Sequence, residues 1–436
     1  GLITTATIFS QKLDKVPDWL KAPILIPLVA QIWIAPIQMF YFNTFSLYSI
    51  FANISTVCLL SVISFCGFVS SVISVITPLA DITCRIFDFG LNYLLNILVW
   101  ISDFFANLPH CVLQTTHPNL LQLLFYYSVL LTVTFLVKYE KYKESILVTI
   151  IGVVIILGTT IRPVSHKLEI IAFDVQNADS FLIKTPQNKY FFIDTGKAPY
   201  KSGNSQAKII MLKYLKDRGI KDLEGVIVTH FDNDHSGGTV DFIENTNIKT
   251  LYLNSTEKET QTAKDIFNAV KKLKQNVRIV KNEDIIYFEP NLTLKTYKAK
   301  IGGKNRSNEC STVTLLSYGK FEMLFMGDAG VTSFNQLQKD IPHNVEVLKV
   351  GHHGGPRVVD SQMLEHLGNR VSLISTGINY FGHPNKGTID ILRNTDILRT
   401  DLLNSIKIMT DGNEYKIYSY DTHDKRYQFR ENFYSK

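Results

Sequence analysis

The hydrophobic pattern divides the chain into two parts of different character. Between residues 2 and 161, long runs without a charged residue alternate with short polar links, whereas from residue 168 onward short apolar runs alternate with turns. A run of about 20 apolar residues can cross a bilayer as a helix, and short apolar runs bounded by turns are typical of strands. The pattern predicts an α-helical membrane bundle over 1–161, followed by a mixed domain of strands and helices over 162–436.

Five segments of the first part are long and apolar enough to be membrane spans. They cover residues 24–42, 45–80, 82–108, 120–137 and 145–161. Pro27 and Pro36 predict kinks in the first segment, of the kind that neighbouring helices repair by supplying hydrogen bonds. The second segment is 36 residues long, which is enough for one tilted span with a flank or for a re-entrant pair broken near Gly67.

The segment 82–108 differs from the others because polar residues interrupt it. Asp88 and Asp103 flank a short apolar centre that also contains Asn92 and Asn96. Polar groups within a membrane segment usually face the interior of a bundle or a water-filled path. An amphipathic helix that lies in the membrane interface explains the same pattern equally well.

Basic residues in the links predict how the first part is oriented. The link 138–144 contains three lysines and joins the last two spans as a tight hairpin, so we expect it on the cytoplasmic side. Residues 162–436 then follow on the opposite side of the membrane. The three lysines before the first span agree with this orientation if 45–80 and 82–108 each cross once, whereas two basic residues after the last span weakly favour the opposite one.

The second part alternates between strand-like and helix-like segments. Strands are predicted over 168–175, 190–194, 225–229, 250–253, 312–318, 321–326, 345–350 and 371–375. Helices are predicted over 205–218, 236–245, 257–274, 332–339 and 361–367. Two groups of strands with helices between them fit two packed sheets covered by helices, although periodicity alone leaves other α/β layouts open.

Charge and cysteine content differ between the two parts. Residues 1–161 contain seven Lys or Arg and seven Asp or Glu, so the whole net charge of +6 lies in the second part. A basic surface suits an anionic partner such as nucleic acid, and a mildly basic solvated surface explains the charge equally well. Cys310 is alone in the second part, which predicts that this part has no internal disulfide. The other four cysteines behave as small apolar residues; they are Cys58, Cys66, Cys84 and Cys111.

The densest chemistry lies in the segment 225–238. A short apolar run of strand character is followed within six residues by four metal-capable side chains, His230, Asp232, Asp234 and His235. Histidine nitrogen together with aspartate oxygen suits a divalent transition metal. A polar turn with Asp234 or Ser236 as the N-cap of a helix is the alternative, but capping requires one such residue and not four. Gly237 and Gly238 are expected to let the backbone turn sharply.

Three further strand ends carry polar residues that fit the same site. Asp194 ends the strand at 190–194, where an ordinary Asx turn is the alternative. Asp328 stands between small residues in Met-Gly-Asp-Ala-Gly, a sequence that by itself is more typical of a turn. His352 and His353 follow the strand at 345–350 and are flanked by glycines, which is poor core material.

The segment 230–235 is similar to the HxHxDH signature of the metallo-β-lactamase fold, with Asp232 in the place of the second histidine. Together with the preceding membrane segments and the Asn-x-x-Gly-His-Pro element at 379–384, it makes the chain resemble the ComEC-type family of competence DNA-uptake channels. The resemblance implies an αββα domain over 162–436. It also implies the C-terminal part of a longer protein, and the start of the chain, without Met or a charged region, gives no sign of a signal peptide.

Two departures from the family pattern bear on the site. Residues 307–311 read Ser-Asn-Glu-Cys-Ser where metallo-β-lactamases have the third histidine of their first metal position, although competence-family members also carry Asn and Ser there. Residues 175–179 read Val-Gln-Asn-Ala-Asp in place of the usual glycine-rich Val-Gly-Gln-Gly-Asp.

The resemblance implies a site for one or two divalent ions. The implied ligands are His230, Asp232, Asp234, His235, Asp328 and one of His352 and His353, and Asp194 would support the metal loop without binding metal. Three carboxylates among six ligands shift the preference from zinc toward manganese or magnesium. The catalytic candidates are Asp234, Asn308 and Ser311 at the phosphate, and His383 as a proton donor or as a structural residue.

The implied function is DNA uptake across the bacterial cytoplasmic (inner) membrane in natural transformation. A metal-dependent nuclease on the extracytoplasmic side would degrade one strand while the other passes through the membrane part. The expected partners are double-stranded and single-stranded DNA, the lipid bilayer, a DNA receptor, a cytosolic motor and a second copy of the chain. Candidate contacts to the DNA backbone are Lys298, Lys300, Lys304 and Arg306, for which a solvated basic loop is the alternative.

Two other functions remain open from the sequence. In the first, the domain is not an enzyme: its metal site is weak or absent, and it guides single-stranded DNA to the channel. Alternatively, the chain is a membrane-tethered metallo-hydrolase for another phosphodiester or a lactone. The incomplete first metal position favours the guiding role, whereas Asp234, His235 and Asp328 favour an enzyme.

Overall fold

A computed structural model describes residues 2–12, 17–42, 44–75, 80–109, 111–115, 118–160, 167–199, 203–257, 259–301, 307–423 and 426–435. The chain divides into two compact units, one over residues 1–163 and the other over most of 164–436. Residues 161–166 lie outside the described ranges, so the expected boundary between 161 and 162 stays a prediction.

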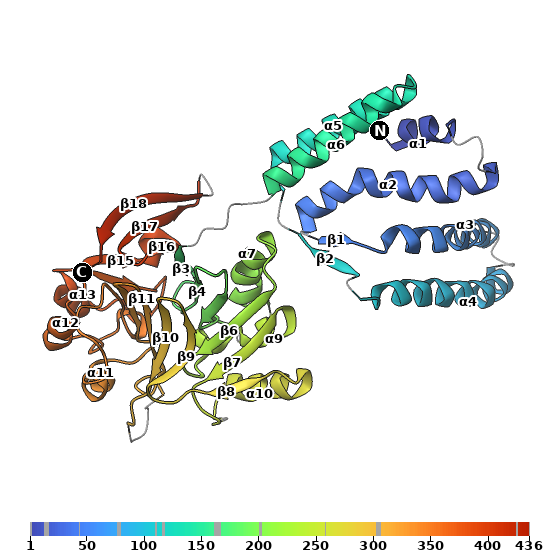
Figure 1. Ribbon diagram of the computed structural model, residues 1–436. Helices are drawn as coiled ribbons and strands as arrows, with labels where there is room; N and C mark the ends of the chain where they lie inside the picture. Colours follow the sequence, from blue (N-terminus) through green and yellow to red (C-terminus); the bar gives the residue numbers. More distant parts are fainter. Residues whose placement is uncertain are drawn as a thin grey trace. The chain divides into compact units, whose positions relative to one another are not determined.

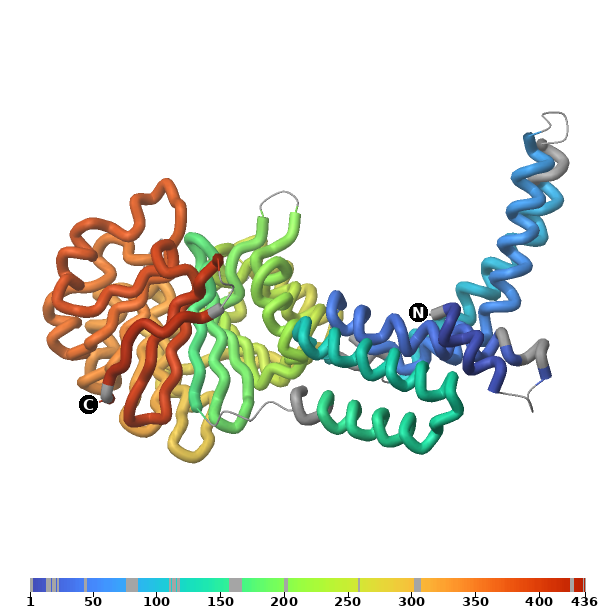
Figure 2. The backbone as a smooth tube through the Cα atoms, turned by 90° about the horizontal axis from the view of Figure 1, so that it is seen from above, coloured from blue at the N-terminus to red at the C-terminus, as the bar shows by residue number. Residues whose placement is uncertain are grey.

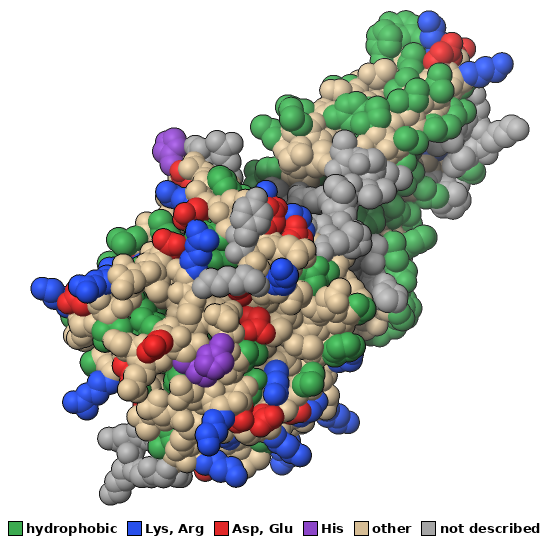
Figure 3. Space-filling view, turned by 60° about the vertical axis from the view of Figure 1, so that its left-hand side comes forward, with side chains coloured by type: hydrophobic (Ala, Val, Ile, Leu, Met, Phe, Trp, Pro, Cys, Tyr) green, Lys and Arg blue, Asp and Glu red, His purple; other side chains and the backbone are tan. Residues whose placement is uncertain are grey.

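The first unit is built of six helices. They are α1 (Leu2–Ser10), α2 (Asp18–Phe42), α3 (Ser49–Ile73), α4 (Ala80–Ala106), α5 (Leu120–Lys138) and α6 (Tyr142–Thr160). Among the described residues, four helical segments are long and apolar enough to cross a membrane: Pro23–Phe42, Ser49–Ile73, Arg85–Ala106 and Leu120–Lys138. Figure 3 shows hydrophobic side chains over much of the visible surface of this unit, as a lipid-facing surface requires. The number of crossings stays a prediction.

The helices of the first unit are paired. Figures 1 and 2 show α3 beside α4 and α5 beside α6, each pair forming a hairpin. At the base of the α3–α4 hairpin, β1 (Thr44–Ser46) pairs antiparallel with β2 (Val112–Gln114). Helix α3 continues unbroken past Gly67, so the re-entrant pair considered for this segment is not formed.

Helix α2 contains Pro36, which has no backbone N–H for the carbonyl of Ile32. The hydroxyl of Tyr126 in α5 donates a hydrogen bond to that carbonyl at 2.9 Å. The neighbouring Tyr127 donates to the carbonyl of Trp33 at 2.7 Å. A neighbouring helix therefore satisfies the backbone group that the proline leaves free, as expected for a proline within a membrane segment.

The second unit contains two β-sheets packed face to face. The larger sheet has nine strands in the order β18-β17-β16-β3-β4-β5-β6-β7-β8. Their bounds are β3 Leu168–Ala172, β4 Phe181–Lys184, β5 Tyr190–Ile193, β6 Asp222–Val228, β7 Asn247–Leu253, β8 Val277–Ile279, β16 Ile406–Thr410, β17 Glu414–Asp421 and β18 Arg426–Tyr434.

The smaller sheet has seven strands in the order β15-β14-β13-β12-β11-β10-β9. Their bounds are β9 Asp284–Glu289, β10 Leu292–Tyr297, β11 Val313–Tyr318, β12 Phe321–Phe325, β13 Val347–Lys349, β14 Val371–Ile374 and β15 Asp396–Arg399. Each of the eight strands predicted from the sequence falls on one of these sixteen strands.

Helices cover the outer face of each sheet (Figure 1). On the larger sheet they are η2 (Ala207–Met211), α7 (Leu212–Asp217), α8 (Asn233–Ser236), α9 (Thr239–Asn245) and α10 (Gln261–Leu273). On the smaller sheet they are α11 (Val331–Leu337), α12 (Ser361–Leu367) and α13 (Lys386–Leu392). The short α14 (Thr400–Leu403) follows β15. The predicted helix at 236–245 is divided between α8 and α9.

The side chains of β5 show how the layers form. Phe191 and Ile193 point into the core between the two sheets, whereas Phe192 packs under the helices of the larger sheet. This alternation with a period of two, repeated in neighbouring strands, buries both faces of the sheet. The second unit therefore has the αββα arrangement expected from the sequence.

Strand direction decides where polar loops meet. In the larger sheet β5, β6 and β7 are parallel, and in the smaller sheet β12, β13 and β14 are parallel. Loops that follow the carboxyl ends of parallel strands lie at one edge of a sheet, which is where such folds place ligands. The polar segments that follow β5, β6, β12 and β13 are thus brought to one place.

Candidate metal centre

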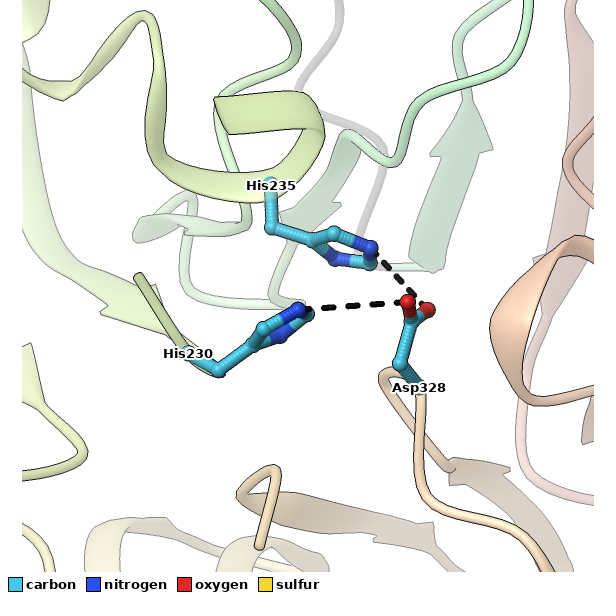
Figure 4. A group of neighbouring side chains, drawn as sticks. All are labelled: His230, His235 and Asp328. Carbon is cyan, nitrogen blue, oxygen red and sulfur yellow. Dashed lines mark ion pairs between the residues drawn. The ribbon is translucent and has the colours of Figure 1, made fainter. Parts of the chain in front are cut away.

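Three buried side chains from the two sheets converge at this edge. His230 follows β6, His235 belongs to α8, and Asp328 follows β12 in the opposite sheet (Figure 4). Nε2 of His235 lies 3.0 Å from Oδ1 of Asp328. Nε2 of His230 lies 3.8 Å from Oδ2 of the same carboxylate. Two imidazoles and a carboxylate at this spacing are suited to a divalent transition metal.

A second group shares His235 with the first. It contains Asp234, His235 and His353, whose ligand atoms lie within 4.8 Å of one another. Nε2 of His353 lies 3.4 Å from Oδ2 of Asp234. His352 is more peripheral: its side chain is 37% exposed, and its Nε2 lies 3.3 Å from the amide nitrogen of Asn308 and 3.9 Å from Oδ2 of Asp328. Of the two adjacent histidines, the geometry favours His353 as a ligand.

Hydrogen bonds at Nδ1 orient the histidine rings. Nδ1 of His353 lies 2.9 Å from the carbonyl oxygen of Ser375, which can only accept, so this nitrogen carries the hydrogen. Nδ1 of His235 lies 2.7 Å from Oδ2 of Asp194 and donates in the same way. In both rings Nε2 is then the atom that faces the site, as in metal centres where a second partner fixes the tautomer of the ligand.

Asp194 connects this orientation to the loop after β6. Its Oδ1 accepts the backbone N–H of Thr229 at 2.8 Å, and its Oδ2 accepts the hydroxyl of Thr229 at 2.7 Å as well as His235. Asp194 adopts a left-handed backbone conformation with φ of 58°. These contacts are those of a residue that supports the metal loop, the part implied for it by the family resemblance.

The unsatisfied polar atoms provide a test of whether a metal fits. Among the described residues, Nε2 of His230, His235 and His353 and Oδ1 of Asp328 are buried and make no hydrogen bond of acceptable geometry. Buried polar atoms are rarely left in this state. These atoms belong to two groups that share His235, one with His230 and Asp328 and one with His353 and Asp234, and each offers a lone pair that can coordinate a divalent ion.

Electrostatics at the site point the same way. Burial would lower the pKa of His235, but the carboxylates of Asp328, Asp194 and Asp179 raise it well above its usual value. Burial would raise the pKa of Asp328, but the nearby histidines hold it well below its usual value. Without an ion, protons on the histidines balance the carboxylates; a divalent cation takes over that role and releases the protons.

A buried ion pair, Lys349 with Asp179, lies beneath the site and was missed by sequence reasoning. Nζ of Lys349 donates to Oδ2 of Asp179 and, at 2.8 Å, to the carbonyl oxygen of Gly327. Oδ1 of Asp179 lies 3.5 Å from Nδ1 of His353. A lysine within the apolar segment 345–350 was the available signal, because a buried lysine requires a partner. Because Lys349 already neutralises Asp179, we exclude this carboxylate from the ligand set.

Asp232 stands at the edge of the site. Its side chain is 39% exposed, and its Oδ2 lies 3.5 Å from Nε2 of His230. Although Asp232 is the N-cap residue of α8, its side chain makes no capping hydrogen bond. The polar-turn alternative placed Asp234 or Ser236 at the N-cap, but both lie within α8, and the N-cap position falls to Asp232.

Ser311 does not have the exposed position that a phosphate contact requires. It is fully buried, its Oγ lies 3.2 Å from Nδ1 of His230, and it accepts the backbone N–H of Asp328 at 3.3 Å. Ser311 therefore contacts two candidate ligands, His230 and Asp328, and its burial favours a positioning role over the expected contact with a phosphate. Asn308, beside the exposed His352, stays a candidate phosphate contact.

The basic segment before this turn is also less available than expected. Nζ of Lys298 donates to the carbonyl oxygen of Asn254 at 2.5 Å, and burial lowers the pKa of this half-buried lysine. Lys298 thus braces the fold, which removes it from the expected DNA contacts. Lys300 is exposed and stays a candidate, whereas Lys304 and Arg306 lie outside the described residues.

The glycine pair after His235 is required for a different reason than expected. Gly237 and Gly238 have helical backbone angles, with φ of −59° and −87°. A Cβ on Gly237 would lie 2.3 Å from the backbone nitrogen of Ala198, and one on Gly238 would lie 2.3 Å from the carbonyl oxygen of Thr195. The pair therefore allows close approach of the segment after β5, and not a sharp turn.

His383 lies at the rim of the centre. Its ring is 5.1 Å from that of His352, and its Nδ1 is buried without a hydrogen-bond partner among the described residues. Burial, together with His352 and His353, lowers the pKa of His383. A neutral imidazole at the rim is close enough to the candidate ligands to contact a bound substrate. The catalytic and the structural role expected for His383 both stay predictions.

Comparison with known proteins reproduces the division of the chain. Residues 1–139 match the family model of competence proteins, and residues 174–376 match that of the metallo-beta-lactamase superfamily. ComE operon protein 3 of Bacillus subtilis is 24% identical over 420 residues, which cover 92% of this chain and 53% of that protein. Recombination protein 2 of Haemophilus influenzae is 28% identical over 189 residues, which cover 43% of this chain and 22% of that protein.

Among solved structures, the metallo-beta-lactamase fold protein YhfI from Bacillus subtilis is similar with a TM-score of 0.37 and 10% identity, covering 53% of this chain and 97% of that one. The two packed sheets and the ligand-bearing strand ends make the second unit a domain of the metallo-beta-lactamase superfamily. The chain thus combines a competence-protein domain with a metallo-beta-lactamase domain, and it is a homologue of ComE operon protein 3, the ComEC-type protein, over 92% of its length. It spans about half of the length of the Bacillus subtilis relative.

Proposed function

We propose that the αββα domain is a metal-dependent phosphodiesterase that cleaves DNA during uptake. The observation that carries this proposal is the set of buried, unsatisfied ligand atoms of His230, His235, His353 and Asp328. Such a centre polarises a phosphate and lowers the pKa of a bound water, which are the two requirements of phosphodiester hydrolysis. Manganese, zinc and magnesium are the candidate ions, in one or two copies.

The residues of the chain divide the work around that centre. His235 and His353 are held by Asp194 and Ser375, so their Nε2 atoms are oriented before any ion or substrate arrives. Preorganised groups of this kind do not have to reorient during the reaction. Asp234, whose side chain is 29% exposed and lies beside His353, would serve as a further ligand. Asn308 would bind a phosphate oxygen, and the ring N–H of neutral His383 would donate a hydrogen bond to the leaving oxygen.

The membrane unit supports the proposal that the strand left uncleaved is transported. DNA uptake across the cytoplasmic membrane requires a path for one strand, and the apolar helix α4 is interrupted by polar residues that include Asp88, Asn92 and Asp103. Polar residues in such a helix suit a bundle interior or a water-filled path. The incoming DNA, a DNA receptor, a cytosolic motor and a second copy of the chain are the proposed partners, and the last three rest on the family resemblance alone.

The charges of the helical unit support an extracytoplasmic position for the domain. The ammonium of Lys12 pairs with Glu140 in the α5–α6 link, so lysines from two segments lie at one end of the unit. Lysine-rich ends favour the cytoplasmic side. Protease treatment of intact spheroplasts tests this orientation, because an extracytoplasmic domain is digested there and a cytoplasmic one is protected.

The decisive experiment measures DNA cleavage and bound metal together. The full chain, purified in detergent, is incubated with labelled DNA and Mn²⁺, Mg²⁺ or Zn²⁺, beside the variants Asp234→Ala and Asp390→Ala. Asp390 is an exposed aspartate of α13 and serves as the matched control. Metal-dependent cleavage that Asp234→Ala abolishes and Asp390→Ala retains is the expected result.

Two other outcomes would point to the alternative functions. Absence of both cleavage and bound metal would overturn the phosphodiesterase and favour a domain that only guides single-stranded DNA. The open position left by residues 307–311 is the observation behind that alternative. Bound metal without cleavage of DNA would indicate a hydrolase for another phosphodiester or for a lactone.

A further inference from the structure

The loop between β14 and α13 exposes three large apolar side chains beside the metal centre. Ile378, Tyr380 and Phe381 are 93%, 104% and 76% exposed. We refer to these three residues as the apolar loop. Single exposed apolar residues are common on protein surfaces, but three within four positions mark a contact surface. The hydrogen bonds of Asn379, which lies within the same loop, fix the backbone that carries these side chains.

Asn379 holds the apolar loop in a fixed shape. Its amide nitrogen donates to the carbonyl oxygens of Gly377 and His383 at 2.8 and 2.7 Å. Its amide oxygen accepts the backbone N–H groups of Phe381 and His383, both at 3.0 Å. One half-buried amide thus makes four hydrogen bonds and closes the loop, which fixes the backbone that carries the exposed side chains.

A series of ring contacts joins the apolar loop to the centre. The ring of Phe381 lies 5.8 Å from that of His383, with an angle of 32° between the planes. His383 lies 5.1 Å from His352, and Nε2 of His352 lies 3.9 Å from Oδ2 of Asp328. A bound molecule that stacks on Phe381 would therefore extend one end toward the side chains of the metal centre.

Basic groups lie on the segments that flank the apolar loop. Arg357 is exposed at the end of the segment that carries His352 and His353, and Lys386 is exposed at the start of α13. Arg357 and Asn385 line the same hollow of about 460 Å³. A surface that combines aromatic rings with cations matches a strand whose bases stack and whose phosphates are anionic.

We propose that the apolar loop is a stacking platform for unpaired bases, which makes a single strand, or a frayed end, the substrate of the neighbouring metal centre. Bases in a duplex are stacked on one another and offer only their edges to a protein. Aromatic side chains bind the faces of unpaired bases with little preference for sequence. This inference rests on the proposed phosphodiesterase for its biological meaning, and it deepens that proposal by naming the form of DNA.

The platform is tested by binding, without cleavage. The full chain in detergent, treated with EDTA, is titrated with a labelled single strand, with the same strand carrying abasic positions, and with a duplex. The double variant Tyr380→Ala/Phe381→Ala should bind the single strand about tenfold more weakly, because stacking contributes strongly per base. Its affinity for the abasic strand and for the duplex should change little. Phe288→Ala, which removes an equally exposed ring from β9, is the control.

A second variant separates stacking from general apolar contact. Tyr380→Leu/Phe381→Leu keeps an apolar surface and removes the rings, so it should bind as weakly as the alanine variant. Full affinity in the leucine variant, equal losses for intact and abasic strands, or unchanged affinity in both variants would overturn the platform. Unchanged affinity in both would leave the loop as a contact for a membrane surface or a protein.

The outcome for the platform is distinguishable from that for the enzyme. Loss of single-strand binding in the alanine variant, with no cleavage by the unaltered chain, would support the platform and refute the phosphodiesterase. Metal-dependent cleavage by the unaltered chain, together with unchanged single-strand binding by the alanine variant, would support the phosphodiesterase and refute the platform.

Discussion

The two sides of the candidate metal centre are built in different ways. On the closed side, which we define as His235, His353 and Asp328, every residue is buried and both rings are held by a second partner. On the open side, His230 is buried but Asp232 is 39% exposed, and the turn at 307–311 provides no third histidine. One side is complete within the protein, and the other leaves room for water or substrate.

This difference changes the meaning of the missing histidine. Metal sites that serve only structure are closed by protein ligands, whereas catalytic sites keep at least one position open. An ion held by the residues of the closed side would keep a free position toward the open side, as a catalytic site requires. The departure from the HxHxDH pattern is therefore compatible with catalysis, and the comparison between the sides can be tested residue by residue.

The largest effect is expected from Asp328→Ala, because this carboxylate lies beside the histidines of both sides. Its loss should leave no ion in the purified full chain and no cleavage of DNA. Metal content is measured by mass spectrometry after dialysis, with Asp390→Ala as the control. Retention of bound metal in Asp328→Ala would show that the two sides do not share this residue.

A large loss of stability is expected from Lys349→Met, which leaves Asp179 buried without its partner beneath the closed side. Breaking a buried ion pair in this way costs about 3–5 kcal/mol. Thermal unfolding of the full chain measures the loss. The double variant Lys349→Met/Asp179→Asn removes both charges and should recover most of it; equal destabilisation of the single and double variants would contradict the role assigned to the pair.

The two adjacent histidines should respond unequally to alanine substitution. His353→Ala removes a candidate ligand of the closed side and should weaken metal binding by more than the roughly 10–100-fold typical of changes to groups that only orient a ligand. His352→Ala should leave metal affinity nearly unchanged, because its Nε2 faces Asn308. Titration of the EDTA-treated chain with Mn²⁺ measures both. The opposite ranking would exchange their assignments.

The smallest effect is expected at the open side. Asp232→Ala removes an exposed carboxylate and should lower metal occupancy only a few-fold, since exposed charges contribute little. Asp232→His restores the second histidine of the HxHxDH pattern and should raise the affinity for zinc relative to manganese, because imidazole suits zinc better than a carboxylate does. Competition between the two ions reports this ratio. No difference between the two variants would show that Asp232 is not a ligand.

The sequence predicted the location of the site because its residues lie at strand ends. His230, Asp328 and the His352–His353 pair each follow a short apolar run, and carboxyl ends of parallel strands meet at one edge of a sheet. The choice between His352 and His353 was not readable. It depends on backbone angles, with φ of 44° and 52° at the two positions, and on the carbonyl of Ser375 from another strand.

The sequence predicted the fold in outline but only half of its strands. Strand β16 pairs antiparallel with β3, so that Ile406 lies opposite Ala172, more than two hundred positions earlier in the chain. Pairing across such a distance is decided by the shared core and not by local pattern. Ser311 was expected at the phosphate because it stands where a metal ligand is missing, and Lys298 because it precedes that turn in a basic segment. Tertiary contacts, which the sequence does not reveal, bury the first and half-bury the second.

The buried ammonium of Lys349 bears on the order in which this domain is assembled. Proteins whose buried carboxylates have no counter-charge often fold only when their ion arrives, because uncompensated buried charge is costly. Here Asp179 is balanced by the chain itself from the moment the sheets close. The charge of Asp179 therefore does not need a metal ion to be balanced, and under the proposed function this part of the domain can fold before an ion binds.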